Sequence, residues 1–300
     1  MNRCDQAMKK WRLWVIGLFG TFCLAALLLT WYQRQQQNTR YLSAHTPTLF
    51  VHGWRGTAHS TDQMISAAEE AGAAKKVLTV TVTPQGKLIY SGYWRKNQRN
   101  PIIQVIFSNN RAGEVQYTRW LIKLMRDLKQ RYQVAQVNLV GHSMGAYAVV
   151  AYALKVGNQA AYPRLHKLVA IAGPFDGIAG QKSATHPADG TTWTDRFHEN
   201  HLMANGEPLI VHSEYLRLEH LRQNFPRQAK VLNIYGDLKD GTDSDKVVTL
   251  VSATSLRYLV AKRAASYQTQ KVTGPNAEHS RLHQNNPVVD GALIAFLWGK

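Results

Sequence analysis

The chain opens with a long apolar run that differs from everything after it. Residues 13–32 contain no charged side chain, and tryptophan or tyrosine stands near both ends of the run. Twenty helical residues at 1.5 Å each span about 30 Å, which is the thickness of a bilayer's hydrocarbon core. Aromatic side chains favour the membrane interface. The pattern predicts a transmembrane helix over residues 13–32.

The charges beside this run predict its orientation. Four Lys or Arg residues lie within residues 1–12, whereas only Arg34 and Arg40 follow the run closely. The positive-inside rule then keeps residues 1–12 in the cytoplasm and places the rest outside. A cleaved signal peptide is the alternative, but the run is long and no small-residue cleavage site follows it. We expect an uncleaved, single-pass anchor in the cell membrane, a polar tether over residues 33–46 and an extracellular domain.

Over residues 47–300, short apolar runs alternate with helical patterns. The runs predict strands at 48–51, 77–83, 87–90, 102–107, 137–140, 168–172 and 231–235. Spacings of three and four residues predict helices at 115–128, 146–156 and 209–222. Another helix is expected from Ser60, since Gln63 has the spacing of a capping box. Strands that alternate with helices indicate an α/β domain with a mostly parallel sheet and helices on both faces.

The periodic pattern weakens between residues 173 and 226. Gly, His, Asn and Trp are frequent there, and only the last part has helical spacing. Long insertions in α/β domains are often functional. We expect residues 173–226 to form a lid or cap over a site, with an ordinary excursion on the sheet edge as the alternative.

Charge and cysteine content narrow the possible partners. The net charge is +17, and about +12 remains beyond the first forty residues. A basic excess attracts anionic surfaces such as a cell envelope, although simple solubility and surface adhesion is the interpretation that we favour. The Lys and Arg residues are scattered and no nucleic-acid module is visible, so nucleic acid is not expected as a partner. Cys4 and Cys23 both precede the domain, which should therefore contain no disulfide.

One short motif carries candidate chemistry. Residues 141–145 read Gly-His-Ser-Met-Gly and match the G-x-S-x-G nucleophile elbow. They follow an apolar strand and precede an alanine-rich helix, which is the placement that an elbow requires. The sharp turn lifts the hydroxyl group of Ser143 clear of the sheet. The motif predicts Ser143 as a nucleophile.

A serine nucleophile also needs a general base, an acid and an oxyanion hole. In proteins with a nucleophile elbow of this type, the acid and then the histidine follow the serine along the chain, which leaves His279 and His283 as candidate bases. Candidate acids follow the strand at 231–235, at Asp237, Asp240, Asp243 and Asp245. The backbone N–H groups of Met144 and Trp54 are expected to form the oxyanion hole.

No metal or other cofactor is expected. His198 and His201 lack the spacing of a zincin helix and a third ligand. Glycine-rich phosphate loops are absent from the sequence.

Three segments resemble a known family. Phe50-Val-His-Gly-Trp54, Val-Gly-His-Ser-Met-Gly at 140–145 and Glu-His-Ser-Arg-Leu-His at 278–283 are similar to segments of α/β hydrolases. The resemblance is nearest to lipase-like cell-surface hydrolases of Gram-positive bacteria, a family of uncharacterised function, and covers residues 48–298. It implies the α/β-hydrolase fold and a Ser-His-Asp site.

The resemblance also selects a base. In the lipases that the chain resembles, the catalytic histidine begins a His-x-x-Leu loop, and an apolar residue nine positions on opens the last helix. His279, Leu282 and Val288 fit this spacing.

The choice of the acid rests on the same resemblance. Asp245 is similar to the Asp of an Asp-x-x-Val loop, although the family more often has Gly where Lys246 stands. Asp240 is the second choice and Asp176, after the preceding strand, a third.

The sequence as a whole favours an enzyme. We expect a serine hydrolase that cleaves a small-molecule or lipid-like carboxylic ester through an acyl-enzyme. A thioesterase or acyltransferase with the same triad is the first alternative, and a non-catalytic surface-binding domain is the second. Trp54, Trp94, Trp193 and residues 209–221 are candidates for lining an acyl pocket, although aromatic side chains are more often core.

Overall fold

The computed structural model describes residues 3–95, 97–179, 184–185, 192–193 and 197–300. The chain divides into two compact units. One comprises Met1–Ser43 with Gly299–Lys300, and the other comprises Ala44–Trp298.

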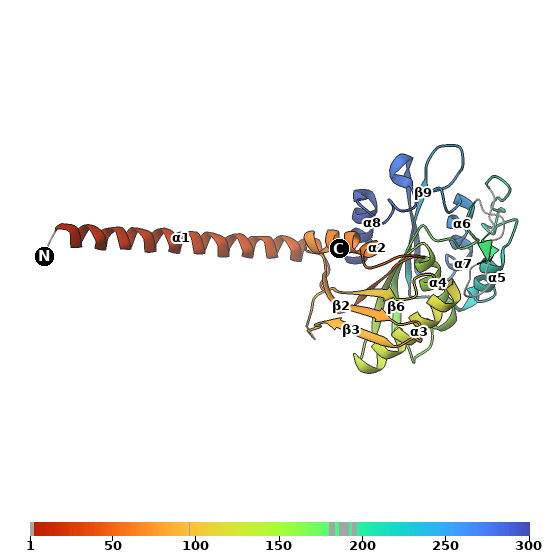
Figure 1. Cartoon of the computed structure of the whole chain (residues 1–300), viewed down its shortest axis with the longest axis horizontal. Helices are drawn as coiled ribbons and strands as arrows, with labels where there is room; N and C mark the ends of the chain where they lie inside the picture. The colour runs from red at the N-terminus through yellow and green to blue at the C-terminus, as the bar shows by residue number, and fades with distance from the viewer. Residues whose placement is uncertain (1–2, 96, 180–183, 186–191, 194–196) are drawn as a thin grey trace. The chain divides into compact units, whose positions relative to one another are not determined.

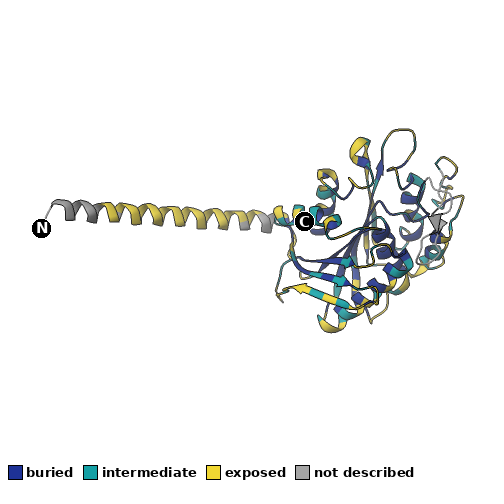
Figure 2. Ribbon diagram, viewed as in Figure 1, coloured by how far each residue is buried: buried dark blue, intermediate teal, exposed yellow. Residues whose placement is uncertain are grey.

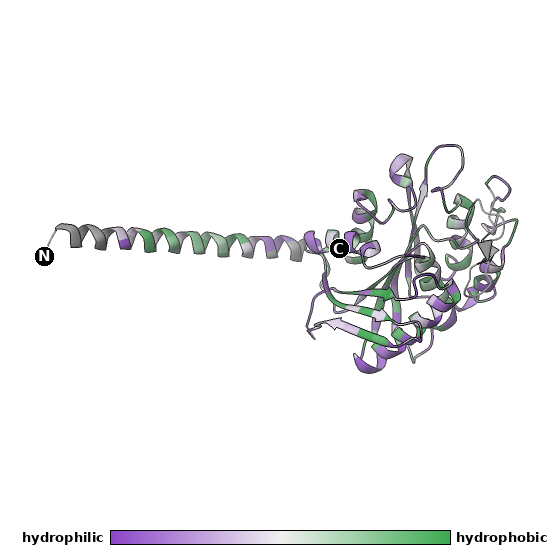
Figure 3. Cartoon of the chain, in the orientation of Figure 1, coloured by the Kyte–Doolittle hydropathy of each residue, from purple (hydrophilic) through white to green (hydrophobic). Residues whose placement is uncertain are grey.

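The first unit is built on one long helix, α1 (Arg3–Arg40). Its segment Trp14–Gln33 is long and apolar enough to cross a membrane, as the hydropathy colouring of Figure 3 shows. The described side chains of this segment are exposed to solvent. The segment is therefore a candidate transmembrane helix, although a signal sequence would share these properties. The polar residues expected as a tether are helical as far as Arg40.

The second unit is built on an eight-stranded sheet in the order β10-β9-β6-β5-β1-β4-β2-β3. Figure 1 labels four of these strands, β2, β3, β6 and β9. Its strands are β1 (Thr48–Val51), β2 (Lys75–Val82), β3 (Leu88–Gly92), β4 (Pro101–Phe107), β5 (Gln136–His142), β6 (Arg164–Ile171), β9 (Lys230–Asp237) and β10 (Ser266–Thr273). Neighbouring strands pair in parallel, except that β3 runs antiparallel to β2. The prediction of a mostly parallel sheet is confirmed. A separate pair consists of β7 (Ala184–Thr185) and β8 (Thr192–Trp193).

Helices cover both faces of this sheet. They are α2 (His59–Glu70), α3 (Glu114–Arg131), α4 (Met144–Val156), α5 (Ser213–Glu219), α6 (Leu250–Thr254), α7 (Leu256–Val260) and α8 (Pro287–Trp298), with 3-10 turns η1 (Arg222–Asn224) and η2 (Gly274–Ala277). Helices α3 and α4 contact each other and share one apolar core with α5, α7 and the sheet. Helices α2 and α8 contact each other on the opposite face.

Helix α4 lies at the centre of this core. Its residues from Met144 to Leu154 are all buried, and four of them are alanine. Small side chains let the helix approach the sheet closely, and Figure 2 shows the central strands as buried too. Protein interiors pack as densely as organic crystals, so this packing holds Met144, the first residue of α4, and Ser143 before it firmly in place.

Two local predictions were wrong. The expected capping box does not form, because α2 begins at His59 with Ala58 as its N-cap, and no side chain caps it. The hydroxyl of Ser60 instead accepts a hydrogen bond from the N–H of Thr57 at 3.2 Å. The helix expected over residues 209–222 is shorter and consists of α5 followed by η1.

Candidate active site

The predicted site residues lie on loops that follow the carboxyl ends of strands in the sheet. Trp54 follows β1 and Ser143 follows β5, whereas Asp245 follows β9 and His279 follows β10 and η2. In a parallel sheet all carboxyl ends lie on the same side, and open α/β sheets bind their ligands there. The topology thus brings together residues that are up to 225 positions apart in sequence.

Ser143 occupies a strained turn between β5 and α4. Its backbone φ is 55°, a conformation that side chains rarely adopt. A Cβ added at Gly145 would lie 2.4 Å from the carbonyl oxygen of Val51, and one at Gly141 would lie 2.4 Å from that of Gly145. Both glycines of the motif are therefore required by close backbone approach.

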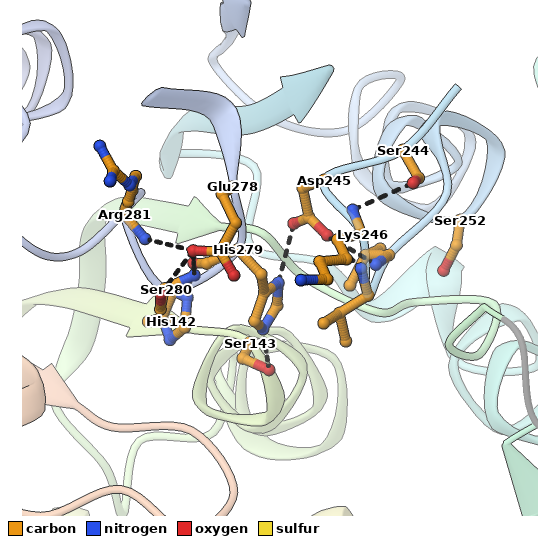
Figure 4. A network of polar contacts seen from close by, with 12 residues as sticks. His142, Ser143, Ser244, Asp245, Lys246, Ser252, Glu278, His279, Ser280 and Arg281 are labelled. Atoms are coloured by element: carbon orange, nitrogen blue, oxygen red, sulfur yellow. Dashed lines mark hydrogen bonds and ion pairs between the residues drawn. The ribbon is translucent and has the colours of Figure 1, made fainter. Parts of the chain in front are cut away.

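Ser143, His279 and Asp245 form one chain of hydrogen bonds (Figure 4). The Ser143 Oγ lies 3.0 Å from Nε2 of His279, and Nδ1 of His279 lies 2.8 Å from Oδ2 of Asp245. The backbone N–H of His279 also donates to the carbonyl oxygen of Asp245 at 2.9 Å. The side chains of His279 and Asp245 are only 12% and 2% exposed, so little water competes for these contacts.

Two opposing effects set the pKa of His279. Burial disfavours the charged imidazolium, but the charge and hydrogen bond of Asp245 outweigh burial and raise the pKa above 6.5. The Glu278 carboxylate adds to the increase. A raised pKa makes the imidazole a stronger base at neutral pH.

Asp245 is held by its own loop. Its Oδ1 accepts hydrogen bonds from the backbone N–H groups of Val247 at 2.9 Å and Val248 at 2.7 Å. This turn places Lys246 at φ 85°. Glycine adopts such a φ without cost, which gives a physical reason for Gly at this position in the lipases that the chain resembles.

The second and third choices for the acid, Asp240 and Asp176, do not contact His279. Asp240 is exposed and accepts hydrogen bonds from the N–H and hydroxyl of Thr242. Asp176 is fully buried, but it accepts from the N–H of His212 at 2.8 Å and from the side chain of Asn200 at 3.0 Å. Asp176 therefore fastens residues 200–212 to the core.

Two further histidines pack behind His279, and the sequence did not assign the first of them. His142 donates through Nε2 to the carbonyl oxygen of His279 at 3.0 Å, and its ring lies 4.1 Å from that of His283. Burial lowers the pKa of His142 far below 6.5 and that of His283 to about 4. Both are neutral at neutral pH and support the loop that carries His279.

The loop after β1 approaches the nucleophile closely. His52 donates through Nδ1 to the carbonyl oxygen of Gly53 at 2.8 Å and accepts at Nε2 from the N–H of Phe107 at 3.0 Å. His52 is thus a structural residue that holds this loop. A Cβ at Gly53 would lie 2.8 Å from the Cβ of Ser143. Only glycine allows the following residue, Trp54, to lie this near the site.

A pocket of about 350 Å³ opens beside Ser143. Its lining comprises Trp54, Arg55, Glu114, Ser143, Met144, Tyr147, Pro174, Gly177, Ile178, Glu214, Val247 and His279. Of the side chains proposed for an acyl pocket, Trp54 lines it, whereas Trp94 stacks on Tyr132 elsewhere. The side chain of Trp193 lies outside the described residues.

The insertion between residues 173 and 226 contributes to this pocket. Pro174, Gly177, Ile178 and Glu214 line it, while Tyr215 and Leu218 lie in the core. Residues 180–183, 186–191 and 194–196 of the expected lid lie outside the described residues.

Sequence analysis did not identify Glu114 and Tyr147 as pocket residues, and it included Glu214 only as a member of the candidate segment 209–221. Tyr147 was detectable, since it stands one helical turn after Ser143 on the same face of α4. No local motif singles out either glutamate, because the two come from different elements, α3 and α5, which meet only in the folded chain.

The fold and the strand-to-helix turn at Ser143 define an α/β hydrolase. The chain belongs to the family described as alpha/beta hydrolase of unknown function (DUF915), whose model matches residues 35–300. The predicted superfamily is confirmed. No match was found among curated proteins.

Solved structures from Gram-positive bacteria are similar to this chain. The product of gene lin2722 from Listeria innocua is 27% identical with a TM-score of 0.71, over 85% of this chain and 94% of that one. A protein from Lactobacillus plantarum WCFS1 described as a cell surface hydrolase is 21% identical with a TM-score of 0.63, over 84% and 89%. The second likeness supports the fold.

Proposed function

We propose that this chain is a membrane-anchored serine hydrolase that cleaves carboxylic esters outside the cytoplasm. The observation that most strongly supports this proposal is the chain of hydrogen bonds from Ser143 through His279 to Asp245, beside a mostly apolar pocket. In this proposal Ser143 is the nucleophile, His279 the general base and Asp245 the acid that fixes the imidazole tautomer. The apolar helix supplies the anchor, and the basic surface faces an anionic cell envelope.

The first half-reaction would acylate Ser143. As its Oγ attacks the carbonyl carbon of the ester, His279 Nε2 takes the hydroxyl proton, and the carbonyl electrons move onto oxygen. When the tetrahedral intermediate collapses, the bond to the alcohol breaks, and the imidazolium gives its proton to the departing alcohol. In the second half-reaction, His279 deprotonates a water molecule that attacks the acyl-enzyme. When this second tetrahedral intermediate collapses, the bond from the acyl carbon to Ser143 Oγ breaks, and the imidazolium returns the proton to Oγ. The products are a carboxylic acid and free Ser143.

The oxyanion would rest on the backbone N–H groups of Met144 and Trp54. Met144 is the first residue of α4, and the first N–H groups of a helix have no partner within it. The helix N-terminus also favours negative charge. Both residues line the pocket that contains Ser143, as this role requires.

Covalent labelling tests this function directly. The full-length protein in detergent should react with a fluorophosphonate, and mass spectrometry should locate the adduct on Ser143. The Ser143→Ala variant should neither be labelled nor hydrolyse short-chain esters. Ser280→Ala is a matched control, because Ser280 lies beside His279 but bonds to Glu278. Labelling that survives in Ser143→Ala would refute the nucleophile.

A second experiment separates hydrolysis from acyl transfer. With alcohols or thiols added as competing acceptors, a hydrolase should still release mainly the free acid. Predominant transfer to the added acceptor would instead support the acyltransferase alternative with the same three residues.

Gly53→Ala should impair catalysis more than folding. The new Cβ would lie 2.8 Å from Ser143 and 3.1 Å from the carbonyl oxygen of His142, so the oxyanion loop must move away. Loss of one oxyanion donor lowers kcat by about 10²–10³-fold, whereas overpacking costs about 1–3 kcal/mol of stability. The measurements are ester hydrolysis and thermal unfolding.

Gly291→Ala is the matched control for this substitution. Gly291 lies in α8, and a Cβ there would meet nothing within 4 Å. Its activity should equal that of the wild type, with a gain of up to about 1 kcal/mol in stability. Wild-type activity in Gly53→Ala would argue against the assigned oxyanion loop.

A further inference from the structure

The pocket beside Ser143 contains more charge than an alkyl-binding pocket needs. Glu114 from α3 and Glu214 from α5 both line it, and both are buried, at 3% and 2% exposure. Charged residues are almost never fully buried unless they are paired. Arg217 lies one helical turn after Glu214 and places its guanidinium 2.7 Å from Oε1 of Glu114. Arg217 therefore pairs directly with Glu114, and its charge also acts on the carboxyl group of Glu214.

The carboxyl group of Glu214 is incompletely paired. Its Oε2 accepts a hydrogen bond from the hydroxyl of Ser213 at 3.3 Å. Its Oε1 is buried and has no hydrogen-bond partner in the part of the chain that the structure describes. Burial raises the pKa of this carboxyl group. An unsatisfied buried acceptor is costly, so its presence in a ligand pocket calls for an explanation.

The carboxyl group of Glu214 is not needed to hold α5 in place. The hydroxyl of Tyr147 donates to the backbone carbonyl oxygen of Glu214 at 2.8 Å, so this contact would form with any side chain. The ion pair between Arg217 and Glu114 joins α5 to α3. Both contacts fasten α5 to its neighbours without the Glu214 carboxyl group, which leaves its Oε1 for a bound molecule.

We propose that Glu214 is a specificity residue that accepts a hydrogen bond from a hydroxyl or ammonium group of the bound ester. This inference rests on the proposed function and narrows its substrate class. Most of the other lining is apolar, with Met144, Pro174, Ile178 and Val247. A plain alkyl ester would leave the Glu214 oxygen unsatisfied, whereas a donor-bearing ester of the same size would satisfy it. Sites with a buried polar group discriminate strongly against analogues that lack the partner.

The test compares esters of matched size. One series consists of ethyl esters of alkanoic acids, ω-hydroxy acids and ω-amino acids of equal chain length. The other consists of butyrate esters of alkanols, diols and amino alcohols, and released acid is titrated at constant pH with the full-length protein in detergent. In at least one series, donor-bearing esters should have a kcat/KM about 10- to 100-fold above their alkyl analogues. Equal values in both series would overturn the inference.

Variants connect the preference to one side chain. Glu214→Leu should abolish or reverse the ratio for both donors. Glu214→Gln keeps a hydrogen-bond acceptor without a charge, so it should retain a preference for hydroxyl and lose the preference for ammonium. Glu219→Gln is the matched control, since Glu219 belongs to α5 but does not line the pocket, and its ratio should equal that of the wild type. A ratio that Glu214→Leu leaves intact would refute the assignment.

A binding measurement separates this inference from the proposed function. Butylammonium and butanol should raise the Tm of the Ser143→Ala protein more than they raise that of a Ser143→Ala, Glu214→Leu double variant. Equal shifts would overturn the inference even in a protein that hydrolyses every ester. An absence of labelling and turnover, with Glu214-dependent binding retained, would refute the hydrolase and leave the binding site.

Discussion

Replacing His279 by alanine should lower kcat for ester hydrolysis by about 10⁵–10⁶-fold. The imidazole is the base closest to the Ser143 hydroxyl, at 3.0 Å, and its raised pKa suits proton transfer near neutral pH. Losses of this size accompany removal of the nucleophile or the base in serine hydrolases, because the triad acts as a unit. Steady-state kinetics on a short-chain ester measures the change, and fluorophosphonate labelling of Ser143 should slow in parallel.

His283 provides the control, because the sequence alone presents two late histidines. Its ring packs against that of His142, and no described contact joins it to Ser143. His283→Asn should therefore lose stability and much less activity, measured at a temperature where circular dichroism shows both variants folded. A His283 variant as inactive as the His279 variant, or an active His279 variant, would contradict the assignment of the base.

The parts of the fold that sequence predicted best are those with strong periodicity. The apolar runs gave β1, β4, β5, β6 and β9, and the amphipathic pattern gave α3. Strand β10 was missed because Ser266–Thr273 is mostly polar and buries only Val272 fully. It forms at the sheet edge, where its eight residues pair in parallel with β9, and edge strands need little apolar surface. Tertiary pairing decides its structure, and the local sequence does not record it.

In the candidate site too, some residues could be predicted from local sequence and others depend on the tertiary fold. Ser143 could be predicted from a local motif, since the elbow's glycines and its neighbouring strand and helix are adjacent in sequence. The choice between Asp240 and Asp245 depends on how one loop folds, and the prediction of Asp245 came from the resemblance to lipases, since spacing left both open. In the structure Asp245 turns inward through a positive φ at Lys246, while Asp240 stays exposed. Glu214 enters the pocket only through the docking of α5.

Asp245→Asn should lower kcat by about 10³–10⁴-fold and also change its pH dependence. In the wild type, kcat/KM should rise with pH through the pKa of His279, above 6.5, because only the neutral imidazole accepts the serine proton. Burial lowers this pKa and the Asp245 carboxylate raises it. An asparagine removes the raising effect and leaves the burial, so the midpoint should move to lower pH. Measuring kcat and kcat/KM across the pH range in the wild type and in Asp245→Asn separates the loss of rate from the shift of the midpoint.

Substitutions of two other carboxylates test whether the effect comes from the direct contact between Asp245 and His279 or from any negative charge nearby. Asp240→Asn removes an exposed charge that bonds only within its own loop, so rate and midpoint should stay near those of the wild type. Asp176→Asn disturbs a buried contact to His212 and should lower the Tm, while the midpoint stays in place. A downward shift of the midpoint confined to Asp245→Asn therefore requires direct contact with His279, since a change in stability alone would not move it. Loss of activity in Asp176→Asn with wild-type kinetics in Asp245→Asn would transfer the role of the acid to Asp176.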